Sequence, residues 1–142
     1  MNVINDSLTG DRKMQVVSAD QFVDGLIAAL SIEGKHRIDL DDPNVDLQFA
    51  KAYDEFLQQA EALAVVPDFV IAADPYYGDS TCLRDTLLAV RDLRSVALNN
   101  PRFITLTIKM GASGAERVLN ESRIPRQVLQ TLAKKYLVQI AD

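Results

Sequence analysis

The chain contains 142 residues, of which 48% are apolar and 25% are charged, with 20 acidic and 15 basic side chains. This composition is typical of a globular protein and excludes disorder over most of the length. No apolar run reaches 18 residues, which excludes a membrane-spanning helix. The single cysteine, Cys82, excludes a disulfide within the chain. Together with a first segment that lacks a secretion signal, it favours a cytoplasmic location.

The first part of the chain predicts a strand followed by a helix. Residues 1–12 are polar and are expected to be loose or to form an edge strand, and residues 14–17 are expected to form a short strand. Ser18 and Gln21 have the spacing of a capping box, in which each side chain satisfies an exposed backbone donor of the other. The helix that they open has one apolar stripe and is expected to end near Gly34.

The central part predicts a short strand at residues 37–40 and then a long helix. Asp42 is expected to cap this helix, and Pro43 suits its first position because the missing backbone donor does no harm there. Apolar residues at spacings of three and four predict about six turns against the core. They are Val45, Phe49, Ala52, Tyr53, Phe56, Leu57, Ala60 and Leu63. The expected outer face carries Lys51, Asp54, Glu55, Gln58 and Glu61.

An unbroken apolar run at residues 69–73 predicts a strand that is buried on both faces of a sheet. A loop follows it, and an apolar-periodic helix then begins near Ser80. In open α/β sheets, ligands bind where such a loop joins the carboxyl end of a strand to a helix. We therefore expect a candidate ligand site in this loop and the first turn of the helix. Its residues are Asp74, Tyr76, Tyr77, Asp79, Ser80, Thr81 and Cys82.

The chemistry of this candidate site has two interpretations. Free backbone amides with the hydroxyls of Ser80 and Thr81 would favour an anion, and Cys82 could act as a nucleophile. However, the two aspartates of the loop would repel a phosphate, and Gly78 alone does not make a phosphate-binding P-loop. Helix capping and a buried cysteine explain the same residues without any ligand.

The last part of the chain predicts one strand and two helices. Residues 102–109 alternate strictly between apolar and other side chains, which predicts a strand with one wet face, antiparallel or near a sheet edge. Ser113 and Glu116 have the spacing of a second capping box. Pro125 is expected to start the final helix, whose apolar stripe runs to Ile140.

Strands and helices alternate until the final helical pair, which predicts the α/β class. We expect residues 1–142 to form a single layered domain with a small mixed sheet, helices packed on it and a C-terminal helical hairpin. Six apolar side chains from different elements are expected to meet in one core. They are Phe49, Phe56, Ile71, Leu87, Leu106 and Leu132.

Charge is distributed unevenly along the chain. Residues 1–79 contain 15 acidic and 5 basic side chains, whereas residues 80–142 contain 5 acidic and 10 basic ones. If the fold keeps the two halves apart, this difference predicts one acidic face and one basic face. Solvation of separate surfaces would explain it equally well.

The patterns expected of metal and catalytic sites are weak. The acidic run does not have the spacing of an EF-hand loop, and helix capping explains part of it. This run comprises Asp39, Asp41, Asp42 and Asp46. His36 is the only histidine and lies beside two basic residues, so a zinc site or a catalytic triad would lack identifiable partners. The sequence therefore predicts no metal, no cofactor and no catalytic residues.

The remaining observations favour a non-catalytic protein-interaction module of the inhibitor, immunity or adaptor type. Its acidic surface, with Asp54, Glu55 and Glu61, would bind another protein that has a basic surface. One alternative is a small-ligand-binding protein or small enzyme with its site at residues 74–82. Another is a DNA-binding regulator that uses the helical pair at residues 113–139, but a sequence pI of 4.8 disfavours nucleic acid as a partner. No membrane partner is expected, and the oligomeric state is left open.

Overall fold

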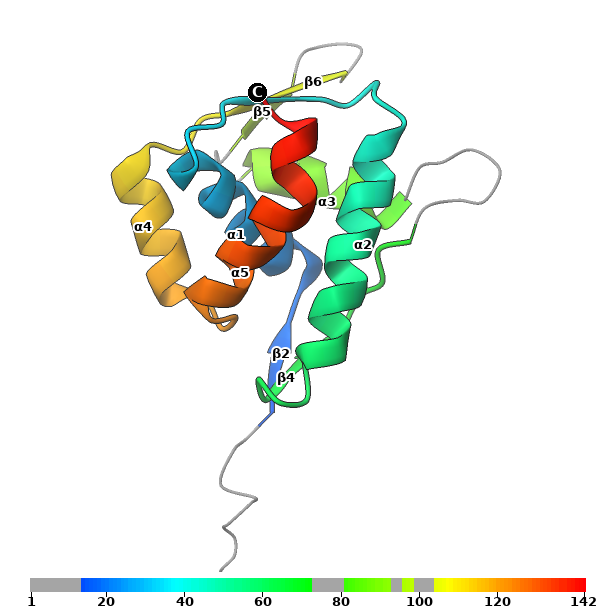
Figure 1. Ribbon diagram of the computed structural model, residues 1–142, viewed down its shortest axis with the longest axis vertical. Coiled ribbons are helices and arrows are strands. Elements are labelled where there is room, and N and C mark those ends of the chain that lie inside the picture. The colour runs from blue at the N-terminus through cyan, green and yellow to red at the C-terminus, as the bar shows by residue number, and fades with distance from the viewer. Residues whose placement is uncertain (1–13, 73–80, 93–95, 99–103) are drawn as a thin grey trace, which may run out of the picture.

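The computed structural model describes residues 14–72, 81–92, 96–98 and 104–142. Within these ranges the chain forms five α-helices, a parallel sheet of two strands and an antiparallel sheet of three, with a helical segment at the C-terminus. The expected α/β class is therefore confirmed, although the parallel and antiparallel pairings belong to separate sheets. The three-stranded sheet lies over one end of the helices, and the two-stranded sheet extends from the opposite end (Figure 1). The expectation for residues 1–12 lies outside the described residues.

Helix α1 (Ala19–Ile32) is the buried centre of the molecule. The expected capping box is confirmed, because the Gln21 amide donates to Ser18 Oγ at 3.4 Å and the Ser18 amide donates to Gln21 Oε1 at 2.9 Å. The helix ends at Ile32, close to the expected place, and Gly34 just beyond it has a φ of +82°, which suits a residue without a Cβ atom. A Cβ atom at Gly25 would lie 2.8 Å from Leu129 Cδ1, so this glycine allows the last helices to approach α1 closely.

Helix α2 (Asn44–Gln59) begins one residue later than the sequence predicts, because Pro43 is its N-cap rather than its first residue, and it ends before the expected six turns are complete. Asp42 Oδ1 accepts a hydrogen bond from the Asn44 amide at 2.9 Å, and Pro43 immediately precedes the helix. The expectation that Leu57 faces the core is wrong, because its side chain is 47% exposed. Its neighbour Phe56 is fully buried, so the buried face of α2 is centred on the side of the helix where Phe56 lies. Leu57 therefore lies at the border between the outer face and the covered side.

The two-stranded sheet pairs β2 (Gln15–Val17) with β4 (Val65–Pro67) in parallel. The strand expected within residues 69–73 is wrong over its described part, because the chain pairs as β4 a few residues earlier and Val70 is 63% exposed. The Phe69 carbonyl instead accepts a hydrogen bond from the Tyr53 hydroxyl at 2.6 Å. Residue 73 lies outside the described residues.

The three-stranded sheet has the order β3 (Arg37–Asp39), β6 (Thr105–Ile108) and β5 (Val96–Leu98). The antiparallel pairing expected for residues 102–109 is confirmed where it is described, and residues 102 and 103 lie outside that part. Its expected place near an edge is wrong, because β6 is the middle strand. The sequence pattern missed β5, which has three residues. The chain end covers β3, since the Asp142 amide donates to the Arg37 carbonyl at 2.7 Å.

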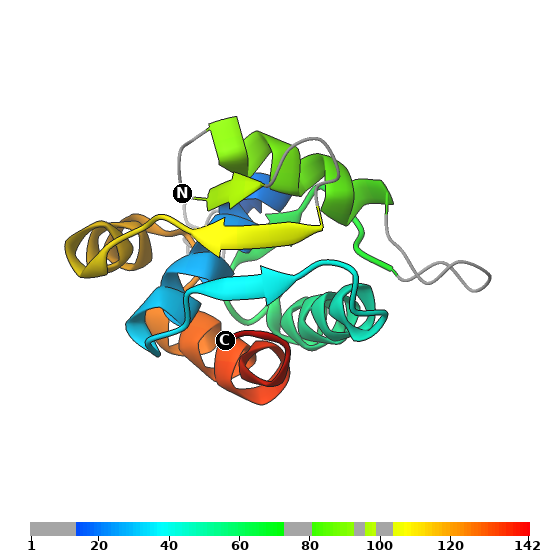
Figure 2. The ribbon, with the colours of Figure 1, turned by 90° about the horizontal axis from the view of Figure 1, so that it is seen from above.

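The last helices are α3 (Thr81–Asp92), α4 (Ala112–Glu121) and α5 (Arg126–Leu132). Helix α5 continues as a π-helical turn, η2 (Ala133–Leu137), and a 3₁₀ turn, η3 (Val138–Ile140). The capping box expected from Ser113 and Glu116 is wrong: α4 begins before Ser113, and no side chain caps it. Seen from above, the three-stranded sheet lies among α2, α3, α4 and the C-terminal helical segment (Figure 2).

One hydrophobic core joins these elements, as the sequence predicts. The six expected core residues are all buried in a single cluster. An aromatic group lies within it, in which the Phe22 ring centre is 5.0 Å from that of Phe56, 5.6 Å from that of Phe69 and 6.2 Å from that of Tyr53. This group fastens α1 to α2 and to the segment after β4.

Candidate functional site

The ligand site expected from the sequence falls largely outside the described residues. This applies to residues 74–80, while Thr81 begins α3. Cys82 is half-buried in the first turn of that helix, with Sγ 4.0 Å from Thr86 Oγ1. The Thr86 hydroxyl also donates to the Cys82 carbonyl at 2.6 Å, so a local helical contact accounts for its position.

A shallow groove of about 500 Å³ lies beside Cys82, between the start of α1 and α3. Its lining residues are Ala19, Asp20, Cys82, Asp85, Thr86 and Ala89. None of these described residues is a histidine, lysine or arginine, so the groove offers no positive charge to stabilise a thiolate, and the carboxylates of Asp20 and Asp85 would disfavour one. This arrangement does not favour nucleophilic catalysis by Cys82.

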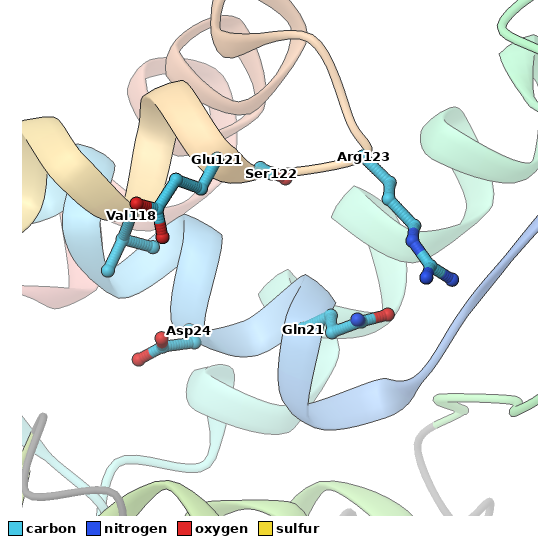
Figure 3. Close-up of a pocket in the computed structure, with 6 residues that line it drawn as sticks. All are labelled: Gln21, Asp24, Val118, Glu121, Ser122 and Arg123. Atoms are coloured by element: carbon cyan, nitrogen blue, oxygen red, sulfur yellow. The ribbon is translucent and has the colours of Figure 1, made fainter.

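A second hollow, of about 360 Å³, lies between α1, the end of α4 and the turn that follows (Figure 3). The carboxylates of Asp24 and Glu121 line one part of it, and the Arg123 side chain extends away on the other side. The Arg123 guanidinium donates to the Val16 carbonyl at 2.5 Å, so it also contacts β2. Sequence reasoning missed this hollow because residues about 100 positions apart build it, and no motif connects them.

The acidic run of the sequence has structural roles. Asp39 Oδ1 accepts a hydrogen bond from the Asp41 amide at 3.0 Å, and Asp42 Oδ1 accepts one from the amide of Asn44, the first residue of α2. Asp46 is only 2% exposed and forms a two-point ion pair with the Arg84 guanidinium, whose Nε lies 3.3 Å from Asp46 Oδ2. Across the described ranges, no group of three or more His, Cys, Asp and Glu side chains is arranged to hold a metal ion.

Three basic side chains of the C-terminal helical segment form ion pairs within the protein. Arg126 forms a two-point ion pair with Glu116, in which Nη2 lies 2.9 Å from Oε2. Hydrogen bonds from Arg126 lower the pKa of the Glu116 carboxyl. Lys134 Nζ lies 3.6 Å from Glu33 Oε2. Lys135 likewise pairs with an acid on α2, so three of the charges that a nucleic-acid backbone would need are engaged, while Arg117 on α4 is exposed.

Some of the charged side chains form ion pairs between the two halves of the chain. Four ion pairs among the described residues connect a side chain before residue 80 with one after it. They are Arg37–Asp142, Arg84–Asp46, Lys134–Glu33 and Lys135–Glu55. These pairs connect the acidic and the basic part of the sequence within the fold.

The three acidic residues expected to bind a partner differ in their surroundings. Glu55 is 22% exposed and accepts hydrogen bonds from Lys135 Nζ at 2.6 Å and from the Tyr136 hydroxyl at 2.7 Å. These bonds, with that of Lys135 the stronger influence, hold the pKa of Glu55 below its ordinary value. Asp54 and Glu61 are exposed, and neither has an ion-pair partner in the described part of the chain.

These two acids belong to a solvent-facing strip of α2 that we name the α2 outer face. Its members share a 120° arc of the helix surface and its continuation. They are Leu47, Lys51, Asp54, Leu57, Gln58 and Glu61. Leu47 is 40% exposed and Leu57 is 47% exposed, so this strip also presents apolar side chains to solvent. The views from the side and from above place α2 at the periphery, with the C-terminal helical segment along one side of it (Figures 1 and 2).

Comparisons with family models, with curated proteins and with solved structures give no match to this chain. None of the helices in the described ranges combines the length and the apolar character needed to cross a membrane. Function is therefore argued from the surfaces themselves.

Proposed function

We propose that this chain is a non-catalytic protein-interaction module, of the inhibitor, immunity or adaptor type, that binds a partner protein with a basic surface. The observation that carries the proposal is the α2 outer face, where Asp54 and Glu61 are exposed beside the exposed Leu47 and Leu57. Protein interfaces combine apolar and charged side chains, and this face exposes both kinds. Because its single cysteine is free, we also propose a cytoplasmic location.

Electrostatics support Asp54 and Glu61 as the residues that attract the partner. Exposed carboxylates without an internal ion pair increase the rate of encounter with a positively charged surface. Glu55, by contrast, would have to give up its bonds to Lys135 and Tyr136 before it could bind elsewhere. We therefore propose Asp54 and Glu61 as contact residues and Glu55 as a residue that fastens α2 to the C-terminal helices.

The two alternatives have less support. A DNA-binding regulator would need several free basic side chains on the C-terminal helical pair, whereas Arg126, Lys134 and Lys135 are engaged with acids and Arg117 is one exposed arginine beside them. A small-ligand site at residues 74–82 rests on residues of which the structure describes the backbone of Thr81 and the whole of Cys82. Neither alternative accounts for the two exposed leucines of α2.

A capture experiment with a matched control tests the proposal. The tagged protein is used to capture partners from a lysate treated with nuclease, and it is compared with the Asp54→Lys/Glu61→Lys variant. The control variant, Asp85→Lys/Glu121→Lys, makes the same change in net charge at two exposed acids on other helices. We expect a partner that survives nuclease, is lost with the α2 variant and is retained by the control.

Kinetics of the purified pair provide the second part of the test. Exposed charges are screened over about 8 Å at physiological ionic strength, so the association rate should fall steeply as salt rises. The α2 variant should mainly lower the association rate, and it should change the dissociation rate much less. Capture that depends on nucleic acid, or equal loss of the partner with the control variant, would contradict the proposal.

A further inference from the structure

We draw no further inference here: the strongest candidate, the apolar face that Val16 and Val66 expose on the two-stranded sheet of β2 and β4, carries nothing, because no described part of the structure shows what covers it.

Discussion

Truncation of Phe56 to alanine tests how α2 is oriented on the core. The ring is fully buried and lies 5.0 Å from the Phe22 ring. Loss of its transfer free energy is worth about 2–3 kcal/mol, and the cavity left in a core that relaxes only partly brings the total for such changes to about 3–5 kcal/mol. Loss of the ring pair adds to that cost. We expect Phe56→Ala to lower the free energy of unfolding by about 4 kcal/mol.

The neighbouring residue is the control for this measurement. The sequence pattern assigns Leu57 to the same apolar stripe, but its side chain is 47% exposed, so Leu57→Ala should cost about 1 kcal/mol or less. Urea denaturation followed by circular dichroism measures both values, and an unchanged m-value shows that the denatured state is unaltered. A cost below about 1 kcal/mol for Phe56→Ala, or equal costs for the two variants, would refute the assignment of the buried face.

Two further predictions concern ion pairs that join the halves of the chain. The pKa of Glu55 is lower in the folded state than its ordinary 4.5, so the bonds from Lys135 and Tyr136 stabilise the fold above that pH, and the stabilisation is lost as the pH falls through the folded pKa. Urea melts should therefore show the largest stability difference between wild type and Glu55→Gln near about pH 6, and the difference should shrink as the pH falls to about 3. A difference that does not change with pH would contradict this prediction. Arg84→Met should lower the free energy of unfolding by about 3 kcal/mol, because it leaves the buried Asp46 without the guanidinium. The double variant Asp46→Leu/Arg84→Met should lose less stability than Arg84→Met alone. A greater loss in the double variant would contradict this prediction.

The candidate surfaces could be predicted only in part. The outward direction of Asp54 and Glu61 follows from helical periodicity and agrees with their exposure. The bonds of Glu55 to Lys135 and Tyr136 could not be predicted, because about 80 residues separate the partners. The hollow beside Asp24 could not be predicted for the same reason, since α1 and α4 meet only in the folded chain.

The amino-acid sequence by itself determined the features that depend on neighbours within one or two turns. The capping box of Ser18, the start of α2 after Asp42 and the apolar stripe of the C-terminal helices follow from local hydrogen bonding and from the 3.6-residue period. Such signals can be read locally because the groups that satisfy each other are adjacent in the chain, although the capping box expected at Ser113 shows that the fold can override them.

Only the tertiary structure decided which short segments became strands and which charges were left free. A strand of three residues is defined by its partner rather than by its own pattern, so β4 formed at Val65–Pro67 against β2, while the more apolar run that follows remained unpaired where it is described. Likewise, the fold leaves Leu57 exposed and places Asp46 beside Arg84, so that the two charges pair. Burial and ion pairing are properties of contacts between distant segments, and packing of the whole chain determines those contacts.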